Sequence, residues 1–83
     1  MLIHIGSDTV IDLEDMILIF DYKKLKESKH NRLFLEKVSE KAIIIGSKQN
    51  IASCIVASKE SKEIIYCSPI SCSTLLKRVN NIG

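Results

Sequence analysis

Short apolar runs separated by small polar residues open the chain and predict β-strands. Leu2 to Ile5 is a β-prone run that stops at Gly6-Ser7-Asp8, and Val10 begins a second run after this turn. The acidic stretch 12–15 interrupts that run and predicts a turn or a single helical turn. Met16 to Phe20 is apolar throughout, which predicts a strand buried on both faces.

The pattern changes at Asp21, where a lysine-rich connector begins that carries one apolar anchor, Leu25. Beyond the connector, apolar residues recur at four-residue intervals and predict an amphipathic helix over 29–41, with Ser28 as its N-cap. Ile43 to Ile45 predict a further strand, because three β-branched residues in a row suit a sheet better than a helix.

The last third of the chain predicts a hairpin followed by a helix. Residues 51–58 alternate in the manner of a half-buried strand, and the polar stretch 59–62 connects them to an antiparallel strand over 63–67. Pro69 ends that strand because it cannot donate a hydrogen bond to the sheet, and Ser71 is placed to cap a final helix.

These elements predict one α+β domain spanning residues 1–83, with an antiparallel or mixed sheet of about four to five strands and two helices. The chain is 46% hydrophobic and 27% charged, typical of a folded protein, and is too short for two cores. Its longest unbroken apolar run covers only 16–20, far below the roughly 20 residues that cross a bilayer. We therefore expect a cytoplasmic protein without a membrane segment or secretory signal.

Charge is divided unevenly along the chain. The first 22 residues carry five acids and no lysine or arginine, whereas the remaining 61 carry all twelve bases against five acids, giving net charges of −5 and +7. A basic surface of this kind attracts polyanions, and an acidic segment can dock on a neighbour's basic surface. On composition alone, a mixed solvated surface that binds nothing is an equal alternative.

The candidate DNA contacts are the basic residues of the connector, of the following helix start and of the loop after the isoleucines. They are Lys23, Lys24, Lys26, Lys29, Arg32 and Lys48. Lysine is a compact charge that suits phosphate better than bidentate reading of bases. With few aromatic residues in the chain, we do not expect a platform that stacks single-stranded bases.

Groups for catalysis or metal binding are not gathered in the sequence. The three cysteines form no CxxC pair, and Cys54 and Cys67 lie in strand-like apolar runs where a thiol acts as a small hydrophobic side chain. His4, between two isoleucines, is expected to be a half-buried sheet residue, and Asp12, Glu14 and Asp15 are expected to form a solvated turn. We predict no enzymatic activity, cofactor, metal or small-molecule substrate.

Several segments together resemble a known bacterial family. They are Ile3-His4-Ile5-Gly6, Val10-Ile11, Ile17 to Tyr22, and the most specific segment, Tyr66-Cys67-Ser68-Pro69-Ile70-Ser71-Cys72-Ser73-Thr74-Leu75-Leu76-Lys77-Arg78. On these residues the chain is similar to the extracellular matrix regulatory protein B (RemB-like) family, which is related to the biofilm matrix regulator RemA. The resemblance covers nearly the whole chain.

The resemblance implies a small cytoplasmic bacterial protein of the group that contains matrix-gene regulators. The RemA branch of this group binds DNA and assembles as a ring of identical subunits. RemA-like members have arginine in the turn before the second long strand and in the loop after the helix and strand. This chain instead has Glu14-Asp15 in the first place and Ser47-Lys48-Gln49-Asn50 in the second. Lys48 alone carries positive charge in that loop.

Two hypotheses therefore stand after the sequence. In the first, a homo-oligomeric transcription regulator contacts the phosphates of double-stranded DNA through its lysine patches. In the second, the acidic first segment of one subunit meets the basic region of the next, and the oligomer is an interaction or scaffold module that binds no nucleic acid. For the assembly, the run 2–5 is a candidate open strand edge.

Overall fold

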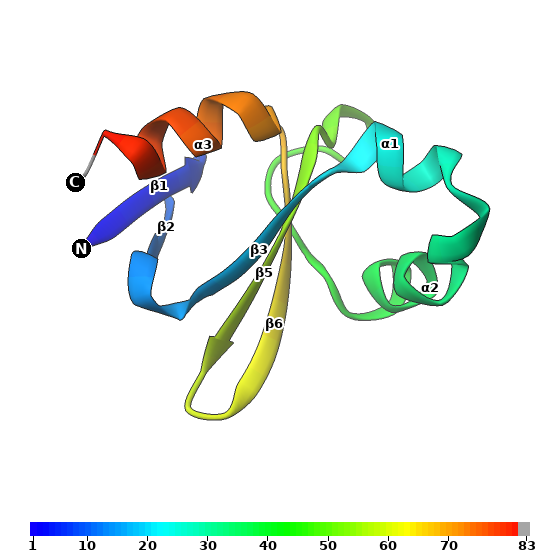
Figure 1. The fold of residues 1–83 in the computed structure, drawn as a ribbon, viewed down its shortest axis with the longest axis horizontal. Coiled ribbons are helices and arrows are strands. Elements are labelled where there is room, and N and C mark those ends of the chain that lie inside the picture. Colours follow the sequence, from blue (N-terminus) through cyan, green and yellow to red (C-terminus); the bar gives the residue numbers. More distant parts are fainter. Residues whose placement is uncertain (82–83) are drawn as a thin grey trace.

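A computed structural model describes residues 1–81 and confirms the α+β class (Figure 1). The strands are β1 (Leu2–Gly6), β2 (Thr9–Asp12), β3 (Met16–Asp21), β4 (Ile43–Ile44), β5 (Ser53–Lys59) and β6 (Lys62–Ser68). The α-helices are α1 (Tyr22–Glu27), α2 (Arg32–Lys41) and α3 (Cys72–Asn80). Single 3₁₀ turns cover Leu13–Asp15, Lys29–Asn31 and Lys48–Asn50.

The strands form two sheets. The β1–β2 hairpin is a two-stranded sheet, and the larger sheet has the order β3-β5-β6-β4. Its β3–β5 and β5–β6 pairs are antiparallel, whereas the short β4 runs parallel to β6. The predicted hairpin at 59–62 is confirmed, with Glu60 and Ser61 at positive φ in its turn.

The burial of two strands differs from the sequence prediction, in opposite directions. The segment 51–58 was expected to be half-buried, but Ser53 to Ala57 are all buried because β5 has a strand on each side and packed residues on both faces. The run 16–20 was expected to be buried on both faces, but β3 lies at the edge of the sheet. Ile17 and Leu18 are 55% and 51% exposed there.

The core has two parts, one on each face of the larger sheet. On one face, Ile55 of β5 packs with residues of the β1–β2 hairpin and with Leu75 of α3. On the other, Cys54 and Val56 pack with α1 and α2. Successive side chains of a strand point to opposite faces, so β5 supplies both clusters. Figure 1 accordingly shows α3 with β1 and β2 at one end of the long axis, and α1 and α2 at the other.

The segment predicted to be a basic connector contains a third helix, α1. The helix predicted over 29–41 begins with a 3₁₀ turn and becomes α-helical at Arg32. Ser28 precedes that turn, but its side chain makes no capping hydrogen bond, so this part of the prediction is wrong. Ser71 does cap α3, since its hydroxyl accepts a hydrogen bond from the Thr74 amide at 3.2 Å.

Within residues 1–81, no helix is both long enough and apolar enough to cross a membrane.

Candidate nucleic-acid interface

Helix α1 holds three of the predicted basic residues at the surface. Its N-cap is Asp21, whose carboxylate accepts a hydrogen bond from the Lys24 amide at 3.1 Å. Leu25 is the only buried residue of the helix and fixes it to the sheet. With that side chain turned inward, Lys23, Lys24 and Lys26 remain exposed.

Lys48 lies in the 3₁₀ turn after β4. Gly46 adopts a φ of +81°, which favours glycine, and the Ser47 hydroxyl then accepts a hydrogen bond from the Gln49 amide at 3.2 Å. As the chain leaves this turn, the carbonyl of Ala52 accepts a hydrogen bond from the Tyr22 amide at 3.1 Å. This bond brings the start of α1 beside the segment that carries Lys48.

A groove of about 740 Å³ opens where the two segments meet. Three lysines from these separate elements line it together with one glutamate; the lining residues are Tyr22, Lys23, Lys26, Glu27, Lys48, Gln49 and Ile51. Three ammonium groups against one carboxylate leave a net positive surface that can bind phosphate groups.

The predicted basic residues therefore divide into two sets. Lys23, Lys26 and Lys48 come together in the groove, although Lys48 lies more than twenty residues away in the sequence. The other three lie outside it. Lys24 and Lys29 are exposed, and Arg32 has its Nε 4.0 Å from the Glu36 carboxylate on the same helix.

Tyr22 is an aromatic residue of the groove that sequence reasoning did not place there. The ammonium of Lys26 lies 5.3 Å from the centre of its ring, a cation–π contact that helps to orient this lysine. Burial raises the pKa of the Tyr22 phenol, with a smaller contribution from the nearby Cys54 and Cys67. The spacing of Tyr22 and Lys26, four residues apart, was the signal available in the sequence.

An inner hollow of about 160 Å³ adjoins the groove and shares Tyr22, Lys48 and Ile51 with it. It reaches Cys67 in the core. The Sγ atoms of Cys54 and Cys67 are 4.0 Å apart, and the hydrogen bond between them and burial raise the pKa of the Cys54 thiol. Both cysteines are buried, as the sequence predicted, and Cys54 stays protonated at neutral pH.

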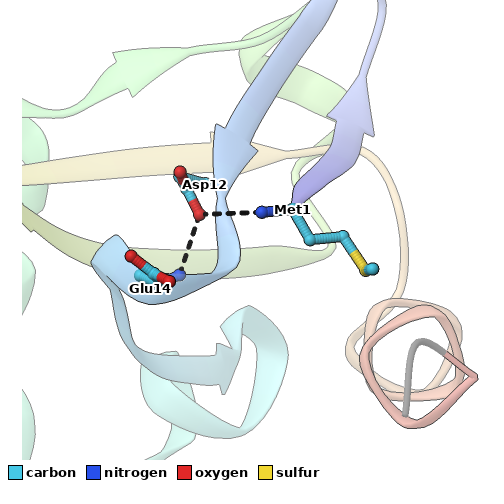
Figure 2. Close-up of polar contacts among 3 residues, drawn as sticks. All are labelled: Met1, Asp12 and Glu14. Atoms are coloured by element: carbon cyan, nitrogen blue, oxygen red, sulfur yellow. Dashed lines mark hydrogen bonds and ion pairs between the residues drawn. The ribbon is translucent and has the colours of Figure 1, made fainter.

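The acidic turn at 12–15 lies at the other end of the molecule, where Asp12 organises it. Figure 2 shows its carboxylate between the amino group of Met1, at 3.3 Å, and the amide of Glu14, at 3.1 Å. The hydrogen bond from Glu14 and the amino group lower the pKa of Asp12. This arrangement agrees with the structural turn predicted for these acids.

His4 lies on the same end and is exposed, so the expectation that it is half-buried is wrong. Its Nε2 contacts the carbonyl oxygen of Ser7, and Arg78 of α3 donates a hydrogen bond to the His4 carbonyl at 2.8 Å. Among residues 1–81, no three histidine, cysteine, aspartate or glutamate side chains are grouped closely enough to hold a metal ion.

Comparison with known proteins identifies the family. No family model matches the chain, and no solved structure matches it. Over 78 residues, however, it is 37% identical to extracellular matrix regulatory protein B of Bacillus subtilis (strain 168), an alignment that covers 94% of this chain and 89% of the relative. The chain belongs to the family of extracellular matrix regulatory protein B.

Membership of this family confirms the resemblance inferred from the sequence, and it extends over most of both proteins. The name of the Bacillus relative describes a regulatory protein of the extracellular matrix.

Proposed function

We propose that this protein is a non-enzymatic regulator that binds double-stranded DNA as a homo-oligomer, through phosphate contacts from Lys23, Lys26 and Lys48. The observation that carries the proposal is the convergence of these lysines, from helix α1 and from the 3₁₀ turn Lys48–Asn50, on one groove. The regulatory name of the Bacillus relative supports the same class of function.

The electrostatics of the groove set the expected strength of binding. Each phosphate neutralised by a lysine contributes about −0.9 to the slope of log K against log salt concentration, so three contacts per subunit give a slope near −3. Glu27 in the same groove lowers the attraction. One subunit therefore binds weakly, and several subunits that present their grooves together bind much more tightly.

A fluorescence anisotropy titration with labelled duplex DNA, repeated across salt concentrations, tests the proposal. The triple variant Lys23→Gln/Lys26→Gln/Lys48→Gln should lose at least tenfold in affinity and show a shallower salt dependence. A control with the same loss of charge, Lys37→Gln/Lys62→Gln/Lys77→Gln, changes exposed lysines outside the groove and should lose much less.

Equal losses in the two triple variants, or no salt-sensitive binding by the wild type at low salt, would refute the role of the groove. In the second case, an oligomer that persists without DNA and dissociates at high salt would support the alternative, a scaffold held together by its own opposite charges.

A further inference from the structure

The larger sheet has two edges of opposite charge. Within residues 1–81, β3 and β4 are its outer strands, each paired on one side only. An edge strand presents unpaired backbone groups to its surroundings, and proteins commonly protect such an edge or use it to bind another chain. The residues that border these two edges indicate that they bind another chain.

The β3 edge is apolar with acidic ends. The pairing with β5 shifts between Met16 and Leu18, so that Ile17 is an extra residue, and both Ile17 and Leu18 point to solvent. Glu14 and Asp15 precede the strand and Asp21 ends it. The nearest lysine or arginine in the sequence lies beyond that end, in α1.

The β4 edge is apolar with basic ends. Ile43 is 51% exposed, and Lys41 precedes the strand while Lys48 follows it. The sequence between these two lysines contains no acid, and one acid, Glu40, directly precedes Lys41. The spacing of charges on the two edges is similar: Asp15 to Asp21 spans about 20 Å and Lys41 to Lys48 at most about 23 Å, at about 3.3 Å per extended residue.

We propose that the β3 edge of one copy of this chain binds the β4 edge of a second copy. The exposed isoleucines and Leu18 would pack against each other, with Asp15 paired with Lys41 at the start of the strands. The strand directions permit this: β4 is parallel to β6, and β5 is antiparallel to both β6 and β3, so β3 and β4 point the same way. Two copies side by side with the same face up therefore align Asp15 of one copy with Lys41 of the other at the start of the two strands.

The charges also disfavour the alternative pairings. A β3 edge against a β3 edge places acids beside acids, and a β4 edge against a β4 edge places lysines beside lysines. Only the unlike pair is favourable, and it uses a different surface on each copy. A contact of this head-to-tail kind leaves a free edge for the next copy, so assembly continues until the chain of subunits closes.

This inference names the contact for the homo-oligomer and rests on that part of the proposed function, but not on the binding of DNA. It places the join at β3 and β4, whereas the sequence suggested the run 2–5; β1 pairs with β2 on one side only, so that prediction stays a separate one. The tests leave Lys48 unchanged, because this lysine also lines the groove.

A charge exchange between the edges tests the contact, with mass measured by size-exclusion chromatography and light scattering. The variants Glu14→Lys/Asp15→Lys and Lys41→Glu should each fall to the monomer mass at a concentration where the wild type is assembled. Mixed in equal amounts they should assemble again, because each β3 edge then meets a β4 edge of opposite charge. Lys37→Glu, an exposed change on α2, is the matched control and should leave the wild-type mass unchanged.

Circular dichroism of each variant checks that the fold is intact. A monomeric wild type, single variants that keep the wild-type mass, or a mixture that stays monomeric would each overturn the proposed contact. DNA titration of the assembled wild type separates the two proposals, since failure to bind DNA would remove the proposed function and leave the edge contact standing.

Discussion

Helix α1 carries two of the three groove lysines, and one side chain, Leu25, decides whether it stays in place. The helix has six residues, too few to be stable by itself in water. Leu25 is only 4% exposed and packs in the cluster that contains Val38 and Cys54. We therefore expect Leu25→Ala to destabilise the protein and to release α1 from the sheet.

The structure gives the size of this effect. Truncation of a buried leucine to alanine costs about 2–5 kcal/mol, and the lower half of that range applies at Leu25 because a short surface helix can partly collapse into the space. The expected loss of about 2–3 kcal/mol is a large part of the stability of a domain this small, about 4–12 kcal/mol. It corresponds to a fall of about 2 M in the urea midpoint.

Urea unfolding followed by far-ultraviolet circular dichroism measures this loss. The matched control is Leu33→Ala, which removes the same atoms from a leucine that is 78% exposed on α2, and its midpoint should move by less than about 0.5 M. The reasoning would be refuted if the two variants had similar midpoints, because Leu25 would then contribute no more to packing than an exposed leucine.

Three further predictions concern the turns at the other end of the molecule. Gly6→Ala should cost about 2 kcal/mol or more in urea unfolding, since φ is +131° there and a Cβ would lie 3.1 Å from Ile45 and 3.2 Å from Pro69. Ser71→Ala should cost about 1 kcal/mol and lower the melting temperature by about 4–8 °C, because it removes the cap of α3. Asp12→Asn should lower the urea midpoint at neutral pH, and the difference from wild type should vanish on acidification. The pKa of Asp12 is lowered by folding, so its contribution is present above the unfolded pKa, near 4, and is lost as the pH falls through the folded value.

The sequence predicted elements well where the signal was local. The turn at 12–15, the hairpin at 59–62 and the cap at Ser71 all depend on residues close in the chain, and the structure confirms them. Helix α1 was missed because it is short and has one apolar anchor. Its signal was Asp21, a capping residue directly before the helix.

The candidate site shows the same limit. The sequence named Lys23, Lys26 and Lys48 among its candidates, but their charges alone did not distinguish them from Lys24 or Lys29. What separates them is the fold, which places the turn after β4 beside the start of α1. Tyr22 was missed because its role depends on that same junction.

The two errors in strand burial have one physical cause and lead back to the edge contact. The hydrophobic pattern of a strand indicates how many of its side chains are buried. The order of strands in a sheet, in contrast, depends on contacts between residues distant in sequence. β5 is covered on both sides within the subunit. β3 has the apolar sequence of a covered strand yet stands at the edge, with Ile17 and Leu18 half exposed. The proposed second copy, with Ile43 at its edge, would bury these side chains, and the apolar sequence of β3 would then match its burial in the assembly.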